Sequence, residues 1–267
     1  MSRILATYNI KGGVGKTSAA VNLGYLAARD GAPTLLWDLD PQGAATYLFR
    51  VRPKVRGGAR KLIALKSDVD ELIKGTDHPR LDLLPADFSY RHMDLALDNF
   101  KRPTRRLDRV LEPLYDEYRY IFLDCPPGIS LVSESVFELA DALLVPVVPA
   151  TLSSRTFDQL EAVVPRTDAR APSSGSVGRG PLVLAFFSMV DGRKRLHREV
   201  MDELRTARLN VLEAAIPASA QIERMGLVRD VVAAFAPRGP GAAAYEALWE
   251  EVKARVEEGR GTAGPAP

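Results

Sequence analysis

The chain has 267 residues, of which 46% are hydrophobic and 26% are charged, a composition that supports a globular domain with a sizeable core. Its formal net charge of +2 permits anionic partners without requiring them. A single cysteine, Cys125, excludes an internal disulfide framework, and no apolar run approaches the roughly 20 residues that a membrane-spanning helix needs. The first stretch, MSRILATYNI, is too short and too quickly strand-like for a signal peptide, so we expect a cytoplasmic protein.

Short apolar runs alternate with amphipathic stretches, which is the pattern of a mostly parallel sheet covered by helices. The apolar runs predict strands over residues 3–9, 33–40, 81–86, 118–125, 141–149, 182–190 and 210–217. The amphipathic stretches predict helices over 16–29, 67–74, 88–99, 104–117, 131–139, 154–163, 194–207 and 241–257, with Ser67 as an N-cap and Gly31 and Gly75 as C-terminal caps. Residues 50–61 and 166–181 have loop composition. We expect one α/β domain over 1–258 and a flexible tail over 259–267.

The stretch YNIKGGVGKTSAAVNL (8–23) follows a predicted strand and opens a predicted helix, which is the context that a phosphate-binding loop requires. Its glycines let the backbone bend so that successive N–H groups and the helix N-terminus face an anion. In such a loop Lys16 reaches the β- and γ-phosphates of a nucleotide, and the Thr17 hydroxyl ligates Mg²⁺. The expected cofactor-binding residues of the loop are Gly12, Gly13, Val14, Gly15, Lys16, Thr17 and Ser18.

A second lysine distinguishes this loop from the common G-x-x-x-x-G-K-[ST] pattern. That pattern needs a glycine where the chain has Ile10, and the string matches K-G-G-x-G-K-[ST] instead. This deviant loop resembles the one in the ParA/MinD family of ATPases. The resemblance implies a P-loop NTPase fold, ATP and Mg²⁺ as cofactors, and an ATP-dependent sandwich homodimer. It also implies that Lys11 crosses the dimer interface and touches the phosphates bound to the partner subunit, much as an arginine finger does.

Two further motifs stand at the ends of predicted strands. LLWDLDPQGAAT (35–46) is similar to the D-x-D-P-Q-G-x-x-T string of ParA proteins. That resemblance implies that Asp40 orients the attacking water and bonds to metal-bound water, whereas Asp38 supports the metal or the loop. YRYIFLDCPPG (118–128) ends its apolar run in Asp124, the Walker B arrangement for Mg²⁺ coordination. The expected catalytic residues are Lys11, Lys16 and Asp40, and the expected metal-site residues are Thr17, Asp40 and Asp124.

The resemblance extends over nearly the whole chain and is closest to the short, Soj-like ParA proteins. It is carried by LDLLPADFSYRHMDLAL (81–97), ADALLVPVVPATLSSRTFDQL (140–160), FFSMVDGRKRLHREV (186–200) and IPASAQIERMGL (216–227). By this resemblance the turn at Pro217 borders the nucleotide base. The C-terminal helix is rich in glutamate, which disfavours the basic membrane-binding helix of MinD-type proteins, so we expect no membrane partner.

Non-specific DNA is the partner that the short ParA proteins imply, because basic residues on one face of their ATP-bound dimer contact phosphates. Two arginines of the family's I-P-R-N-V-R string are replaced here by Ala218 and Gln221. Arg229, the segment 101–106 and the basic loop 52–61 are therefore additional candidates for binding DNA. The expected DNA-binding residues are Arg193, Lys194, Arg195 and Arg224.

These features favour a ParA-like ATPase that positions or segregates a cargo on nucleoid DNA. The resemblance implies slow turnover that a ParB-like or cargo-adaptor partner stimulates, and a location in the cytoplasm at the nucleoid. A regulatory ATPase of the same family without DNA binding, acting in secretion or in polar or flagellar placement, stays open because of the replaced arginines. A metabolic ligase of the same fold, resembling dethiobiotin synthetase, is disfavoured by Lys11 and the D-x-D-P-Q-G string.

Overall fold

The computed structural model describes residues 2–164, 180–208 and 210–261. Within these ranges eight strands form one sheet: β1 (Arg3–Thr7), β2 (Thr34–Asp38), β3 (Lys74–Gly75), β4 (Leu81–Leu84), β5 (Tyr120–Asp124), β6 (Ala142–Val147), β7 (Leu182–Val190) and β8 (Val211–Pro217). Their order across the sheet is β3-β4-β2-β5-β1-β6-β7-β8. Every neighbouring pair is parallel except β3 with β4, which confirms the predicted α/β class.

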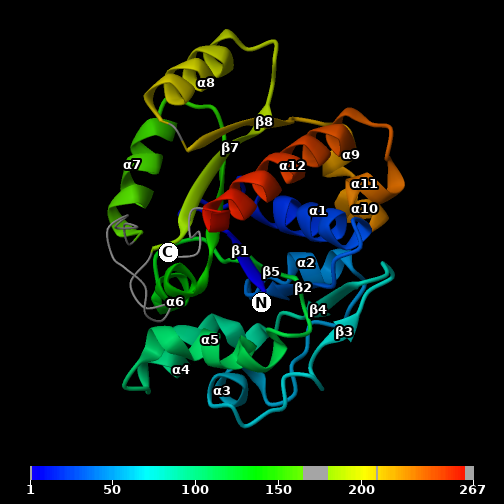
Figure 1. The fold of residues 1–267 in the computed structure, drawn as a ribbon, viewed down its shortest axis with the longest axis vertical. Helices are drawn as coiled ribbons and strands as arrows, with labels where there is room; N and C mark the ends of the chain where they lie inside the picture. Colours follow the sequence, from blue (N-terminus) through cyan, green and yellow to red (C-terminus); the bar gives the residue numbers. More distant parts are fainter. Residues whose placement is uncertain (1, 165–179, 209, 262–267) are drawn as a thin grey trace, which may run out of the picture.

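Helices cover both faces of this sheet (Figure 1). One face is covered by α1 (Lys16–Arg29), α2 (Ala44–Leu48), α11 (Val232–Phe235) and α12 (Pro240–Gly261). The other face is covered by α3 (Gly58–Ile63), α4 (Met93–Asp98), α5 (Arg106–Leu111), α6 (Leu131–Leu139) and α7 (Ser153–Val163). The edge strand β8 packs against α8 (Arg195–Ala207) and is followed by α9 (Ala220–Glu223) and α10 (Met225–Val228). Short 3₁₀ turns precede or follow α4 and α5: η1 (Phe88–His92), η2 (Pro103–Arg105) and η3 (Glu112–Leu114).

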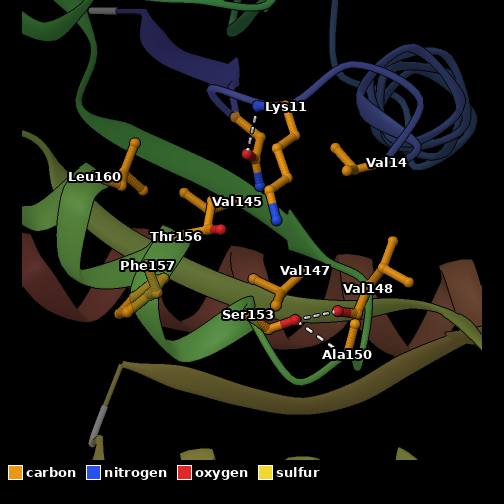
Figure 2. A pocket seen from close by; sticks show the side chains of 11 residues that line it. Lys11, Val14, Val145, Val147, Val148, Ala150, Ser153, Thr156, Phe157 and Leu160 are labelled. Atoms are coloured by element: carbon orange, nitrogen blue, oxygen red, sulfur yellow. Dashed lines mark hydrogen bonds between the residues drawn. The ribbon is translucent and has the colours of Figure 1, made fainter.

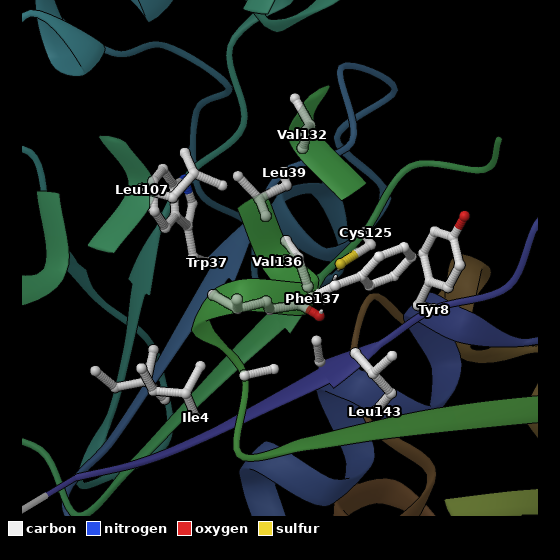
Figure 3. Close-up of a cluster of buried hydrophobic side chains, with 14 of the residues drawn as sticks. Ile4, Tyr8, Trp37, Leu39, Leu107, Cys125, Val132, Val136, Phe137 and Leu143 are labelled. Carbon is white, nitrogen blue, oxygen red and sulfur yellow. Dashed lines mark hydrogen bonds between the residues drawn. The ribbon is translucent and has the colours of Figure 1, made fainter. Parts of the chain in front are cut away.

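Alternate residues of each central strand contribute to two separate hydrophobic cores, because successive side chains point to opposite faces of a sheet. On β2, Leu35 and Trp37 belong to the core under α3 to α7, whereas Leu36 belongs to the core under α1 and α12. Trp37 shares its cluster with Leu107 of α5 and Phe137 of α6 (Figure 3). Burial on both faces explains why these strands read as continuous apolar runs in the sequence.

Several predicted elements are confirmed at their boundaries, and others are wrong. The helices expected over 16–29 and 131–139 are α1 and α6, and Gly31, with φ +95°, follows α1 in the left-handed conformation of a C-terminal cap. The helix expected over 67–74 does not form, so the caps expected at Ser67 and Gly75 are wrong too, and Gly75 belongs to β3. The Asp68 carboxylate accepts a hydrogen bond from the Asp70 N–H at 3.1 Å and stabilises a local turn, after which the chain pairs as β3 against β4.

The segment 50–61, expected as a loop, contains the start of α3 at Gly58. Its helix is short and begins after Gly57, which has φ +88° and no side-chain cap, so the sequence carries no start signal for it. Residues 166–179 of the expected loop and 262–267 of the expected tail lie outside the described residues. Residues 259–261, expected in the tail, belong to α12 instead. Of the helices in the described ranges, none has the length and apolarity needed to cross a membrane.

Candidate active site

The carboxyl ends of the parallel strands bring the predicted site residues to one edge of the sheet. Asp124, the last residue of β5, lies in register with Asp38 of β2 on one side and with Thr7 of β1 on the other. The glycine-rich loop leaves β1 directly after Thr7 and enters α1 at Lys16. The strand order therefore places the loop beside both buried carboxylates, at the edge where open α/β sheets bind ligands.

The glycine-rich loop has a backbone that other residues would strain. Gly13 has φ +70° and Gly15 has φ +95°, both in the left-handed region. A Cβ atom on Gly15 would also approach the Ser188 Oγ of β7 to 2.8 Å. No side chain caps α1, which starts at Lys16. The N–H groups of its first turn are thus available to an anion.

Asn9 and β6 hold the base of the loop in place. The Asn9 amide donates to the Pro146 carbonyl at 2.8 Å, and its oxygen accepts a hydrogen bond from the Lys11 N–H at 2.9 Å. Beside it, Lys11 and Val14 of the loop line a cavity of about 60 Å³ whose other walls come from β6 and α7 (Figure 2). Sequence reasoning missed Asn9, although a polar residue at the buried end of an apolar strand is a signal that could have found it.

The two lysines of the loop occupy opposite environments. Lys16 is only 6% exposed, and its Nζ donates to the Lys11 carbonyl at 3.1 Å. Burial lowers the pKa of the Lys16 ammonium, while the Asp124 carboxylate is the strongest of the groups that oppose this shift. The Lys11 side chain, by contrast, is exposed at the rim of the loop. One ammonium is therefore inside the candidate phosphate site, whereas the Lys11 side chain lies at the exposed rim, where it lines the cavity formed with β6 and α7.

Asp38 supports the segment that follows β2. Its Oδ2 accepts hydrogen bonds from the Thr46 N–H at 2.8 Å and from the Thr46 hydroxyl at 2.7 Å. Burial raises the pKa of Asp38 to about 6, against the opposing effect of those two bonds. The Thr46 oxygen also accepts from the Ala86 N–H at 2.9 Å. Sequence analysis gave Thr46 no role, although the threonine stands at a fixed place in the string that identified Asp38.

Asp124 and Thr17 provide oxygen atoms suited to a magnesium ion. Asp124 is fully buried, and its Oδ2 has no hydrogen-bond partner among the described residues, an unusual state for a buried carboxylate. Burial raises the pKa of Asp124, and the neighbouring Asp38 adds to the rise, whereas the Thr17 hydroxyl and Lys16 oppose it. A cation at this point would stabilise the ionised carboxylate, so the donor set fits Mg²⁺.

Asp40 lies beyond the end of β2, in the turn that leads to α2. Its Oδ1 accepts a hydrogen bond from the Gln42 N–H at 2.9 Å, and the side chain is partly exposed. Its charge acts on Lys16, Asp38 and Asp124, so the structure brings it to the same edge.

Within the described ranges no three His, Cys, Asp or Glu side chains form a metal site by themselves. Mg²⁺ in phosphate-loop proteins also takes ligands from phosphate oxygens and water.

The remaining predicted residues lie along β7, β8 and the segments after them. Pro217 ends β8 and pairs with Val190 of β7. Arg193, Lys194 and Arg195 are exposed together at the start of α8, whereas Arg224 is exposed at the junction of α9 and α10. The Arg193 guanidinium forms two hydrogen bonds of 3.0 Å with the Asp191 carboxylate.

Comparisons with known proteins indicate the family of this chain. Residues 2–172 match the model of a family described as an AAA domain. The chain is 35% identical over 262 residues to the chromosome-partitioning ATPase Soj of Thermus thermophilus, covering 96% of this chain and 97% of that protein. It is 30% identical over 256 residues to the sporulation initiation inhibitor protein Soj of Bacillus subtilis, covering 95% and 99%. A solved structure of a plasmid partition protein of Borrelia burgdorferi bound to AMPPNP has the same fold, with a TM-score of 0.79 and 20% identity over 96% of this chain and 100% of that one. The chain therefore belongs to the ParA/Soj family of ATPases.

Proposed function

We propose that this ATPase uses Mg²⁺ and ATP to form a sandwich dimer, binds nucleoid DNA without sequence preference, and positions or segregates a cargo. A ParB-like or cargo-adaptor partner stimulates its slow hydrolysis, and the protein acts in the cytoplasm at the nucleoid. The observation that carries the proposal is the contrast between the two loop lysines, Lys16 buried in its own subunit and Lys11 exposed. An ammonium placed outside its own phosphate site is suited to the site of a second subunit.

Exposed apolar residues beside Lys11 support the same dimer. Ile129, which follows the turn at Gly128, is 52% exposed, and Leu152, between β6 and α7, is 58% exposed. The Gly128 N–H donates to the Ile10 carbonyl at 3.1 Å, which ties the first of these segments to the loop. Apolar side chains exposed around a functional loop are typical of a surface that a partner covers.

Each residue of the site has a role in this proposal. The loop N–H groups and Lys16 bind and orient the phosphates, and Lys11 completes the charge around the phosphates of the partner subunit. Thr17 and Asp124 hold Mg²⁺, which when bound neutralises phosphate charge. Asp40 orients the attacking water and bonds to water on the metal, and Asp38 holds the Thr46 segment in position. Val14 and Ser18 complete the phosphate loop, and Pro217 borders the base.

Substitution of Lys11 tests the dimer. We expect Lys11→Ala to retain ATP binding but to lose ATP-dependent dimers, measured by light scattering after size exclusion with and without ATP. Lys16→Ala serves as the contrasting variant, because removing the buried ammonium should abolish nucleotide binding itself. Dimers of unchanged stability in Lys11→Ala would contradict the role of Lys11 in the partner's site.

DNA binding is tested with a variant that binds ATP but hydrolyses it slowly. Asp40→Ala should bind ATP, dimerise and hydrolyse ATP at a small fraction of the wild-type rate. On duplex DNA of arbitrary sequence it should bind only with ATP, and the affinity should fall steeply as salt rises because several phosphates are neutralised. Normal hydrolysis in this variant would contradict the role of Asp40.

A regulatory ATPase without DNA binding is the second candidate. Ala218 and Gln221 favour it, because they replace the two arginines of the family's I-P-R-N-V-R string in the segment after β8. The pairing of Arg193 with Asp191 also favours it. An ATP-bound Asp40→Ala dimer with no DNA affinity even at low salt would support this candidate over the first.

A further inference from the structure

A run of basic residues, most of which form no ion pair with a described residue, lies at the end of the molecule opposite α8. Residues 50–66 carry seven basic and no acidic side chains, although the whole chain has a net charge of only +2. This run follows α2 and contains α3, which lies with α4 and α5 at one end of the long axis, whereas α8 lies at the other (Figure 1). Six of the basic residues form no ion pair with another described residue: Arg52, Lys54, Arg56, Arg60, Lys61 and Lys66.

An apolar groove lies beside these charges. The α3–α4 groove has a volume of about 690 Å³. We call its apolar lining residues the floor: Ala59, Ala64, Leu95, Ala96 and Phe100; Ser89, His92 and Asn99 also line the groove. Leu95 is 67% exposed although it lies on a helix that packs against the core. Arg60 and Lys66 also line the groove and place positive charge along its rim.

Two rings at the groove, the exposed Phe88 and the half-buried Phe100, are covered by arginines. The Arg91 guanidinium lies 3.9 Å from the centroid of the Phe88 ring, and that of Arg106 lies 4.2 Å from the Phe100 centroid. Arg106 is held there by its bonds to the Ile63 carbonyl at the end of α3. With the guanidinium groups already stacked, these rings are poorly placed to stack on nucleic-acid bases.

We propose that the α3–α4 groove docks an acidic segment of a partner protein through one or two large apolar side chains. The floor suits the apolar side chains, because it offers mostly hydrocarbon. The rim suits carboxylates, because Arg60 and Lys66 form no ion pair with any residue that the structure describes. A duplex would use the charge but would leave the apolar floor without a partner. The inference does not require the ATP-dependent dimer.

The groove is also connected to the nucleotide site. Asp94 of α4 accepts a hydrogen bond on its Oδ1 from the Val132 N–H at 3.0 Å. Val132 lies in the first turn of α6, which follows Asp124 and the turn after β5. A segment docked in the groove therefore contacts an element that is bonded to the region next to the magnesium site.

The test uses fluorescence anisotropy on the full chain without nucleotide. The probe is a labelled peptide of Glu and Asp with Leu and Phe spaced to share one face of a helix, and the reference is a shuffled peptide of the same composition. We expect the patterned peptide to bind more tightly than the shuffled one. Leu95→Glu and Arg60→Glu should each weaken that binding by about tenfold or more.

Matched variants elsewhere separate docking from general charge effects. Leu227→Glu replaces a leucine that is 83% exposed on α10, and Arg255→Glu reverses an exposed charge on α12; both should leave binding unchanged. Equal binding of the two peptides, or equal losses in the matched variants, would overturn the proposal. So would tighter binding to duplex DNA or to phosphatidylglycerol vesicles that shows the same dependence on Leu95 and Arg60. Circular dichroism verifies that each variant is folded.

Discussion

Thr46 joins three segments around the candidate site with one side chain and its own backbone. Its N–H and hydroxyl both donate to Asp38 at the end of β2, and its oxygen accepts from the Ala86 N–H after β4. All three groups are buried. Buried polar groups that lose a partner are costly, so the position of the turn containing Asp40 depends on this hydroxyl.

Replacing Thr46 with valine preserves the shape and removes the hydroxyl. We expect Thr46→Val to lower the free energy of unfolding by about 2 kcal/mol, because both the Asp38 carboxylate and the Ala86 N–H lose a buried partner. Urea denaturation measures the change. Thr46→Ser keeps the hydroxyl and should retain most of the stability; equal losses in the two variants would show that the methyl group matters instead.

At the scale of the elements, the turn that follows β5 is joined to the segment between β1 and the phosphate loop. The Tyr8 hydroxyl, next to β1, donates to the Gly128 carbonyl at 2.9 Å, and the Gly128 N–H donates to the Ile10 carbonyl at 3.1 Å. Gly128 has φ +91°, and a side chain there would be strained although there is space for one. The turn after Asp124 is thus bonded directly to the segment that begins the phosphate loop.

Removal of the Tyr8 hydroxyl should loosen this turn without disturbing the core. We expect Tyr8→Phe to speed amide hydrogen exchange at residues 128–131 and to lower stability by about 1 kcal/mol. Tyr115→Phe is the control, because it removes a 2.6 Å bond to Asp108 at a distance from the turn. Faster exchange at 128–131 in the control, or none in Tyr8→Phe, would contradict the tethering role.

How far the elements could be predicted depends on what stabilises them. Strands β1, β5 and β6 are buried on both faces, so their apolar runs are visible in the sequence, and the glycine loop is visible because its backbone needs glycine. The short α3 depends on packing, and the turn at Asp68 depends on a single side-chain hydrogen bond. Hydrophobic periodicity in the sequence detects neither of these. The same limit hid part of the roles of Asn9 and Thr46, because their bonds to the Pro146 carbonyl and the Ala86 N–H join segments distant in the chain.

At the scale of the whole molecule, the basic residues at the start of α8 and those over 50–66 lie at two ends and have different local environments. Arg193 and Arg195 at the start of α8 are paired with Asp191 and Glu199, so part of their charge is already neutralised. Six of the seven basic residues over 50–66 have no such ion pair among the described residues, the exception being Arg50, which pairs with Asp77. Affinity for DNA at the α8 end should therefore depend on its carboxylates as much as on its arginines.

Asp191 provides the test of that dependence. The paired Arg193 lowers the pKa of Asp191 to about 2, so the carboxylate stays charged at neutral pH. In an Asp40→Ala background with ATP, Asp191→Asn should raise the affinity for duplex DNA, because it frees the guanidinium for a phosphate. Arg193→Ala should lower the affinity and reduce the slope of log K against log salt by about 0.9 for each phosphate that the variant no longer neutralises.

Asp116→Asn, an exposed carboxylate after η3, makes the same change of net charge away from α8. It should leave the affinity nearly unchanged at moderate salt, because screening removes the effect of distant charges. If Asp116→Asn raises the affinity as much as Asp191→Asn does, the effect comes from net charge and α8 is not the DNA-binding end. If neither Asp191→Asn nor Arg193→Ala changes the affinity, the basic run over 50–66 becomes the DNA-binding candidate instead.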